Sequence, residues 1–518
     1  MSYSAHRPQG YGGQGDLHLG RIVPQLQLTL AEAQRDFSHD TLRLDAYALG
    51  ELASILVEFG EDLYSRGGIW EAYERYNKEF FGTPLPLTLE QSDGWADTGF
   101  GPDRFRHFLW VSYPMLLGNL TLSPTHHDLQ RVADASSAFL SDAFSGVPKD
   151  FGVKAFLRAA NPRGWDIKRK LVWLGTHSFM FRLPFARYMD QQAPGGSDIA
   201  HTDDFVCQEC TRWSGLGAID ILAAVLDISE GDRTALRSWC ERHAAFYRIV
   251  SVSKETLQAV NLVSDQRYRI RIDMRRHPFR RGQVVFGSLV PWRGEWYWSG
   301  EQRLLGDASK VDVNDLKRSM KRHSPAIVCR YSKEYEALVR QRMAALHEQM
   351  LSFHDGQDLV VYPDGLSMAA DWQKEIRWQW ESRPQQEVDA AVRKHGLKKG
   401  RPEMQIPEDL LEEKDGLGVF LDPDEGKEIM THFTTLIAGL TKKGNALTAV
   451  EEETIRGFFN SPAISPRFVR RVLEEYGEES VKAAFLLRGD LPGYWLDYLL
   501  RSQKGHFYRK RYPSLAVV

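Results

Sequence analysis

The sequence predicts an α+β protein in which a helical N-terminal region and a helical C-terminal region flank a small five-stranded antiparallel β-barrel. On both sides of the centre, apolar residues recur at three- and four-residue spacings, as in residues 42–56, which is typical of amphipathic helices. Between residues 246 and 303, five short β-patterned runs follow one another with tight connections. With 518 residues, the chain is too long for one compact core and is expected to form two or three domains.

The five runs predict the strands of the barrel. We expect strands at Phe246–Ser251, Leu257–Val263, Arg267–Ile272, Gln283–Val290 and Glu295–Ser299. Strands of this length and spacing are typical of small closed barrels of the OB-like or SH3-like kind.

Composition and hydrophobic periodicity divide the rest of the chain. We expect a disordered tail at 1–20, a mainly helical domain at 21–245, the barrel at 246–303, a helical and mixed connection at 304–380, a polar linker at 381–415 and a helical C-terminal domain at 416–518. The tail is rich in Gly, Gln and Ser, and the linker contains several Pro and Gly residues, which disfavour a packed core.

The overall charge restricts the partners of the chain. Lys and Arg number 66 and Asp and Glu number 69, so the formal net charge is −3, and any binding of a polyanion must depend on a local patch. Four cysteines in 518 residues are too few for a disulfide framework and indicate a reducing cytoplasm. The longest apolar run, Leu216–Ile228, contains two aspartates and is too short to span a membrane, so no membrane partner is expected.

The third expected strand is the strongest candidate for a binding surface. Arginine alternates with Tyr or Ile along Arg267–Ile272, so one face of the strand would be basic and the other apolar. Residues 265–281 contain seven arginines and two aspartates, a local net charge of +5. Guanidinium groups bind phosphate and aromatic rings stack on bases, so we predict a nucleic-acid-binding or ribonucleoprotein-associated protein. The candidate residues are Arg267, Arg269, Arg271, Arg275, Arg276, Arg280, Arg281, Trp296 and Trp298.

Two other interpretations of this surface stay open. The aromatic residues could form the core of the barrel, while the arginines pair with acidic residues on neighbouring helices. The same arginines and aromatic residues could also form the interface of a protein-interaction scaffold, because both residue types are enriched in protein–protein interfaces.

Three of the four cysteines fall in a pattern that suits zinc. Cys207 and Cys210 are separated by two residues, and so are Cys240 and His243. Two such pairs can complete a tetrahedral structural zinc site, and zinc is the only cofactor that the sequence suggests. The alternative is that Cys240 and His243 lie on a helix in which the cysteine is a small buried residue.

Two His/Asp clusters resemble the local clusters of metal-dependent hydrolases. They are His126-His127-Asp128 and His201-Thr202-Asp203-Asp204. Adjacent histidines on a helix point in different directions, so only one of the first pair could join a site shared with the second cluster. The alternative is helix capping, with Ser123 or Thr125 as the N-cap residue. Because the chain has no Walker loop, HExxH or GxSxG motif, we favour a binding protein over an enzyme and assign no catalytic residue.

Several strand and turn patterns of this chain resemble segments of other proteins. They are FYRIVSV, LQAVNLVSDQRYRI, GQVVFGSLV and GEWYWSG in the barrel, and DGLGVFLDPDEGKE at Asp415–Glu428. In these patterns the chain resembles a group of uncharacterised bacterial cytoplasmic proteins, some of which carry SEC-C zinc tails. The resemblance implies a shared small central β-module and no activity. This chain lacks a Cys/His-rich tail at its C-terminal end, so the resemblance does not imply the zinc site of that group.

Overall fold

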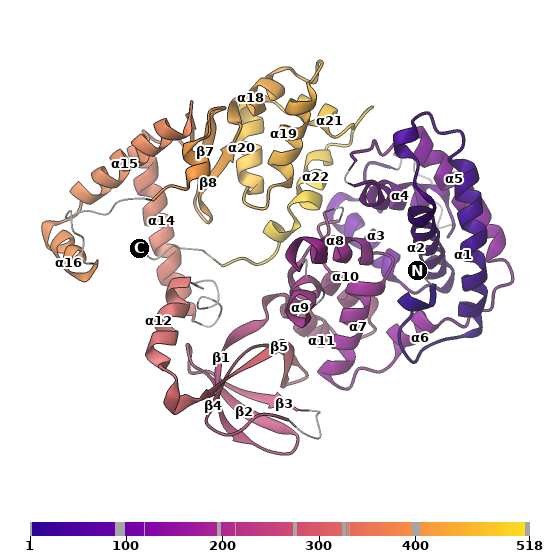
Figure 1. Ribbon diagram of the computed structural model, residues 1–518, viewed down its shortest axis with the longest axis horizontal. Helices are drawn as coiled ribbons and strands as arrows, with labels where there is room; N and C mark the ends of the chain where they lie inside the picture. Colours follow the sequence, from indigo (N-terminus) through magenta and orange to yellow (C-terminus); the bar gives the residue numbers. More distant parts are fainter. Residues whose placement is uncertain are drawn as a thin grey trace. The chain divides into compact units, whose positions relative to one another are not determined.

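A computed structural model describes residues 3–88, 99–118, 120–193, 198–212, 214–272, 277–323, 328, 330, 332–395 and 405–512. The fold is α+β, as predicted, and the chain divides into two compact units (Figure 1). Unit 1 comprises Met1–Lys317 and Leu486–Tyr508, and unit 2 comprises Arg318–Phe485 and Arg509–Val518. The main part of unit 2 is therefore inserted between two parts of the sequence of unit 1.

The core of the helical part of unit 1 is built on α2 (Ala46–Ser65), most of whose residues are buried. The ring of Phe59 lies 4.5–5.0 Å from the rings of Trp70, Phe105 and Phe108, measured between centroids. The other helices before the sheet are η1 (Tyr3–His6), α1 (Gln14–Ala33), η2 (Asp40–Leu42), α3 (Ile69–Phe81), α4 (Pro102–Leu116), α5 (His127–Ala143), α6 (Gly152–Arg158), α7 (Gly164–His177), α8 (Arg182–Gln192), α9 (Ile199–Gln208), α10 (Ala218–Val225), α11 (Glu230–Arg237) and η3 (Ser238–Glu241).

The second sequence part of unit 1 supplies α22 (Trp495–Gln503) and η5 (Gly505–Tyr508). The ring of Tyr498 lies 5.4 Å from that of Phe81 in α3 and 6.1 Å from that of Trp110 in α4, between centroids. A helix from near the end of the sequence therefore completes the core formed by helices near its beginning.

The described part of the expected disordered tail, residues 3–20, contains η1 and the start of α1. Tyr3 and Leu19 are buried, and Arg7 donates hydrogen bonds of 2.6 and 2.7 Å to the carboxylate of Glu61 in α2. Arg7 also forms an ion pair with Asp16. The composition of the segment did not indicate this structure, because the acidic partner of Arg7 lies 54 residues further along the chain.

Unit 1 also contains a mixed five-stranded sheet. Its strands are β1 (His243–Val252), β2 (Thr256–Asn261), β3 (Arg267–Arg271), β4 (Gln283–Trp292) and β5 (Glu295–Asp307). The pairings run in the order β1-β2-β3-β5-β4 and return to β1. β3 and β5 pair in parallel, with Ile270 opposite Trp296, whereas the other pairs are antiparallel. The prediction that the sheet is antiparallel throughout is wrong, because strand directions cannot alternate around a ring of five.

The β4–β5 hairpin packs against the helices of unit 1. Trp292 and Tyr297 belong to the same apolar core as the helices. The indole Nε1 of Trp292 donates to the carbonyl oxygen of Asn161 at 3.3 Å, and that of Trp239 donates to the carbonyl oxygen of Pro291 at 2.7 Å. These contacts fix the hairpin on the helices.

Unit 2 contains a three-stranded antiparallel sheet in the order β6-β7-β8. The strands are β6 (Leu359–Tyr362), β7 (Leu417–Asp422) and β8 (Gly426–Thr431). β6 and β7 come from opposite sides of the segment 381–415, which is expected to be a linker. The boundary between the units falls within α12 (Val313–His323), which follows η4 (Ala308–Lys310) of unit 1. The helices of unit 2 after α12 are α14 (Lys333–Phe353), α15 (Gly365–Glu381), α16 (Gln385–His395), α17 (Glu408–Leu411), α18 (Phe433–Thr441), α19 (Ala449–Asn460), α20 (Pro466–Tyr476) and α21 (Glu479–Ala484).

The expected helical C-terminal domain at 416–518 opens with two strands, β7 and β8, which are joined by a tight turn. The carboxylate of Asp422 accepts hydrogen bonds from the backbone N–H of Asp424 at 2.7 Å and of Glu425 at 2.9 Å. Aspartate commonly stabilises turns in this way. The chain therefore forms a hairpin in which Gly426 begins β8, within a domain that was expected to be helical.

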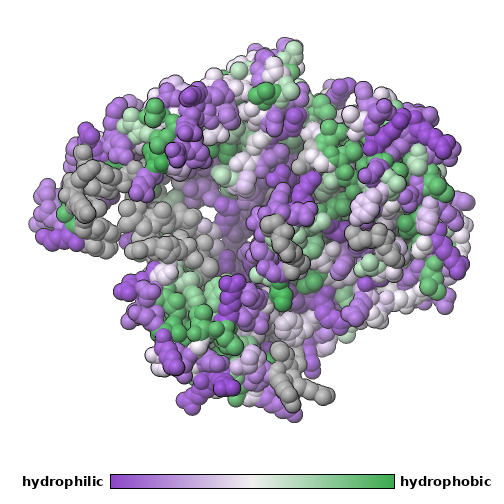
Figure 2. All heavy atoms as spheres, in the orientation of Figure 1, coloured by the Kyte–Doolittle hydropathy of each residue, from purple (hydrophilic) through white to green (hydrophobic). Residues whose placement is uncertain are grey.

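The visible face of the molecule is mostly hydrophilic, with apolar residues in separate small patches (Figure 2). Scattered apolar residues of this kind are usual on folded proteins. Among the helices that the structure describes, none combines the length and the apolar character needed to span a membrane.

Glu428 in β8 is a buried carboxylate with incomplete hydrogen bonding. It is 4% exposed, and its Oε2 accepts a hydrogen bond of 2.9 Å from the backbone N–H of Ser465. Its Oε1 has no hydrogen-bond partner among the described residues. Burial raises the pKa of Glu428 to about 7, the Ser465 hydrogen bonds oppose this shift, and the charge of Asp422 adds to it.

We expect Glu428→Gln to stabilise the protein at pH 8 but not at pH 4. An acid whose pKa is higher in the folded state binds its proton more tightly when folded, so the wild-type free energy of unfolding falls as pH rises from about 4.3 to 7. The glutamine side chain does not titrate, so the variant lacks this loss, and the difference in unfolding free energy at pH 8 is about 4 kcal/mol at most. Urea unfolding at several pH values measures it.

The exposed Glu453 in α19 provides the matched control. Glu453→Gln removes one negative charge from the same unit without removing a buried carboxylate, so its pH profile should follow the wild type. Parallel profiles for wild type and Glu428→Gln would contradict the prediction.

Candidate functional site

The outward side of β1, β2 and β3 carries a row of exposed arginines. Arg248 in β1 lies opposite Val260 in β2, and Val260 lies opposite Arg267 in β3, so the three side chains share one face. Arg269 lies two residues further along β3 on the same face. We call Arg248, Arg267 and Arg269 the basic face. All three side chains are exposed, whereas Val260 between them is 8% exposed, as expected when arginine stems cover an apolar residue.

The arginines differ in their acidic partners. Among the described residues, no acidic side chain forms an ion pair with the three arginines of the basic face. Arg271 is different, because its guanidinium lies 3.2 Å from the carboxylate of Glu255 and 3.8 Å from that of Glu295. The predicted pairing of the arginine row with acidic residues therefore occurs at Arg271, although its partners lie within the sheet region and not on helices.

The remaining predicted arginines lie in the connection between β3 and β4. Arg280 and Arg281 are exposed, and the following Gly282 donates its N–H to the carbonyl oxygen of Ile249 at 2.8 Å. This bond places the end of the connection beside β1. Arg275 and Arg276 lie outside the described residues.

The two predicted stacking tryptophans are not exposed. Trp298 is 4% exposed, and its ring lies 5.8 Å from that of Phe279. Trp296 is partly buried, with its ring 4.6 Å from that of His243 and 4.8 Å from that of Tyr268. The rings of both tryptophans therefore pack against other aromatic rings of the sheet region and are not free to stack on a base. This arrangement agrees with the alternative interpretation, in which the aromatic residues form the core of the barrel.

Arg248 is a member of the basic face that sequence reasoning missed. Its position between Tyr247 and Ile249, which are both buried, gives the same alternation that identified Arg267 and Arg269. The sequence of one strand does not show which residues of β1 lie opposite those of β2. The three arginines could therefore not be assigned to a common face from the sequence.

The four predicted zinc ligands do not form a metal site in this structure. Among the described residues, no group of three or more His, Cys, Asp or Glu ligand atoms within 4.8 Å includes a cysteine. Instead of continuing a helix, the chain passes from η3, which contains Cys240, into β1 at His243. The Nδ1 atom of His243 lies 3.0 Å from the hydroxyl of Tyr268, so this imidazole faces the sheet. Zinc at Cys207, Cys210, Cys240 and His243 stays a prediction without support from this geometry.

Cys207 belongs to a buried charged cluster. Asp203 of α9 is 2% exposed, forms an ion pair with Lys168 of α7, and accepts a hydrogen bond of 2.6 Å from Arg242. The hydroxyl of Ser299 in β5 donates to Asp203 at 2.8 Å. Burial raises the pKa of the Cys207 thiol, although the positive charge of Lys168 opposes this shift. Burial therefore disfavours the thiolate, which is the form that binds zinc. The cluster joins two helices to β5, so we assign it a structural role.

The charges in this cluster fix the ionisation of Asp203. Burial alone would raise the pKa of Asp203, but the positive charges of Lys168 and Arg242 outweigh burial and lower the pKa below its ordinary value. Arg242 also forms an ion pair with Asp204. Both aspartates of the second His/Asp cluster are therefore paired with cations.

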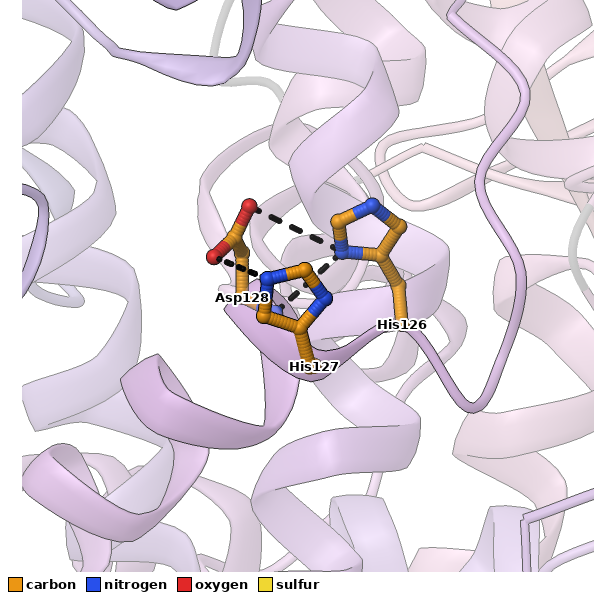
Figure 3. A group of neighbouring side chains, drawn as sticks. All are labelled: His126, His127 and Asp128. Carbon is orange, nitrogen blue, oxygen red and sulfur yellow. Dashed lines mark hydrogen bonds and ion pairs between the residues drawn. The ribbon is translucent and has the colours of Figure 1, made fainter. Parts of the chain in front are cut away.

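The first His/Asp cluster forms a compact group at the start of α5 (Figure 3). His126 is the N-cap residue, and its Nδ1 accepts a hydrogen bond of 3.2 Å from the backbone N–H of Asp128. The prediction of Ser123 or Thr125 as N-cap is therefore wrong. Because His126 has extended backbone angles, its imidazole stacks on that of His127 with centroids 5.0 Å apart. The two histidines thus lie together, contrary to the divergence expected within a helix.

Among the described residues, no group of three or more metal-ligand atoms combines the two His/Asp clusters into one hydrolase site. His126 and His127 lie beside Asp128, whereas Asp203 and Asp204 pair with the cations of α7 and the segment before β1.

No family model, no curated protein and no solved structure matches the chain.

Proposed function

We propose that this protein binds nucleic acid through the basic face, either alone or as part of a ribonucleoprotein. The observation that carries the proposal is the exposure of Arg248, Arg267 and Arg269 on one side of the sheet, without acidic partners among the described residues. Unpaired guanidinium groups in a row attract a polyanion, and they form charge-assisted hydrogen bonds with phosphate oxygens.

The geometry of β3 favours a single strand as the ligand. Arg267 and Arg269 are two residues apart on an extended strand, so their Cα atoms are separated by about 6.5–7 Å. This separation is close to the spacing of neighbouring phosphates in an extended single strand. The pairing order is the one expected of an OB-like barrel, a fold that binds oligonucleotides across strands 2 and 3. Arg267 and Arg269, two of the three arginines of the basic face, lie on β3, which pairs with β2.

A protein-interaction scaffold is the second candidate. Leu304 and Leu305, near the end of β5, are 43% and 45% exposed. Two neighbouring exposed leucines on a strand suit a protein partner better than a nucleic acid. Replacing both leucines with serine should weaken binding to such a partner and leave binding of nucleic acid unchanged.

We expect the double variant Arg267→Gln/Arg269→Gln to bind single-stranded oligonucleotides about tenfold more weakly than the wild type. Two exposed charge contacts of somewhat under 1 kcal/mol each account for this factor. The slope of log K against log salt should decrease in magnitude by about 1.5, because two fewer counterions are released. Fluorescence anisotropy with several oligonucleotide sequences and salt concentrations measures both effects, which should be the same for all sequences.

The matched control is Arg21→Gln/Arg35→Gln, which removes two exposed arginines from or beside α1 of the same unit. It changes the net charge equally but leaves the basic face intact, so affinity and salt slope should stay near the wild-type values. Equal losses in the two double variants would show that net charge alone attracts the nucleic acid. An unchanged affinity in Arg267→Gln/Arg269→Gln would refute the proposal.

A further inference from the structure

His126, His127 and Asp128 bring three potential metal ligands together in one turn of chain. Each residue offers one nitrogen or oxygen atom, and these atoms lie within 4.8 Å of one another. Figure 3 shows both imidazoles beside the carboxylate of Asp128. The Nε2 atom of His127 lies 3.1 Å from Oδ1 of Asp128, and Nδ1 of His126 lies 3.9 Å from Oδ2. Consecutive residues can converge here because the helix begins after His126.

The carboxylate of Asp128 is buried and incompletely paired. It is 1% exposed, and its Oδ2 accepts a hydrogen bond of 3.1 Å from the hydroxyl of Ser38. Its Oδ1 has no hydrogen-bond partner in the described part of the chain, although it points to the imidazole of His127. The ion-pair partners of Asp128 in the described part of the chain are the two imidazoles, not Lys or Arg. A buried carboxylate of this kind is costly unless a cation compensates its charge.

The chemistry of the three ligands selects a class of metal. Two imidazole nitrogens and one carboxylate oxygen suit Zn²⁺ and neighbouring transition metals, whereas Ca²⁺ and Mg²⁺ prefer oxygen ligands throughout. Zinc sites with three protein ligands keep a fourth position for water or another ligand. The side chain of His127 is 65% exposed, so an ion can reach the group from solvent.

We propose that His126, His127 and Asp128 bind one divalent transition-metal ion, for which Zn²⁺ is the expected occupant. Binding replaces the cap hydrogen bond at Nδ1 of His126 and supplies the positive charge that Oδ1 of Asp128 lacks. The site is separate from the basic face, because it lies at the start of α5 and involves no residue of the sheet.

Isothermal titration of the full-length protein, freed of metal with a chelator, tests the proposal with Zn²⁺ as the probe. The wild type should bind one Zn²⁺ per chain, and Co²⁺ should give visible d–d absorption when it binds. His127→Ala should weaken the dissociation constant for Zn²⁺ at least tenfold, since it removes one of three ligands. Because His127 is exposed, this variant should fold normally, and circular dichroism checks the folding.

Two further variants separate this site from other zinc ligands. His18→Ala removes an exposed histidine of α1 and should leave the titration unchanged. Cys210→Ser/Cys240→Ser removes two thiols of the other candidate set and should also leave it unchanged. Absence of Zn²⁺ binding in the wild type would overturn the proposal. Wild-type affinity in His127→Ala, or loss of binding in the cysteine variant, would overturn it as well.

Discussion

Replacing Asp203 with alanine is expected to lower the free energy of unfolding of unit 1 by about 3–5 kcal/mol, the usual result when one partner of a buried ion pair is removed. Asp203 is 2% exposed and pairs with both Lys168 and Arg242, whose side chains are 12% and 11% exposed. The substitution leaves these two cations buried without their shared carboxylate. It also removes the acceptor for the hydroxyl of Ser299 in β5. Urea unfolding measures the change, and hydrogen exchange along α9 and β5 assigns it to unit 1.

Asp204 offers the matched control for this prediction. Asp204 pairs with Arg242 but its side chain is 40% exposed, so Asp204→Ala should cost less than about 1 kcal/mol. Because the pKa of Asp203 is lowered in the folded protein, its contribution is present above pH 4 and is lost as the pH falls through the folded pKa. A cost for Asp203→Ala no larger than that for Asp204→Ala would contradict the assigned structural role.

Gly215→Ala is expected to destabilise unit 1 by about 2–5 kcal/mol. The backbone angle φ of Gly215 is +64°, which costs about 1 kcal/mol or more for a residue with a side chain. A Cβ atom at this position would lie 2.2 Å from the carbonyl oxygen of Arg501 in α22, so one backbone segment must move. Such overpacking typically adds about 1–3 kcal/mol. Thermal unfolding measures the loss, and hydrogen exchange in α22 should increase.

Gly146→Ala separates the two contributions. Gly146 has φ of +85°, and an added Cβ atom would meet no atom within 4 Å. This variant therefore incurs the backbone cost alone, about 1–2 kcal/mol. If the two alanine variants lose the same stability, the approach of α22 to Gly215 does not contribute to folding as we describe.

The strands of unit 1 could be predicted because local alternation determines which side chains a strand buries. Tyr268 and Ile270 are buried and the arginines beside them face outward, as the sequence of β3 implied. Pairing between strands is not a local property. The parallel contact of Ile270 with Trp296 and the common face of Arg248 and Arg267 both depend on the closure of the ring, which no single strand encodes.

Other features depended on interactions that the sequence pattern does not display. The segment around Arg7 is structured by Glu61, a residue distant in sequence. Before residue 426 the carboxylate of Asp422 stabilises a hairpin turn, although the domain was expected to be helical. At the candidate metal group, the position of the helix start decides whether two adjacent imidazoles converge, and His126 capped the helix in place of Ser123 or Thr125.

The split sequence of unit 1 has a consequence for its synthesis. The ribosome must add the 168 residues 318–485 after the sheet is complete and before it reaches the segment that contains α22. At translation rates of about 5–20 residues per second, this interval lasts roughly 8–35 s. Throughout it, the apolar surface around Phe81 and Trp110 lacks the helix that covers it in the finished protein. The nascent chain therefore keeps this apolar surface uncovered until α22 has been synthesised and docks on it.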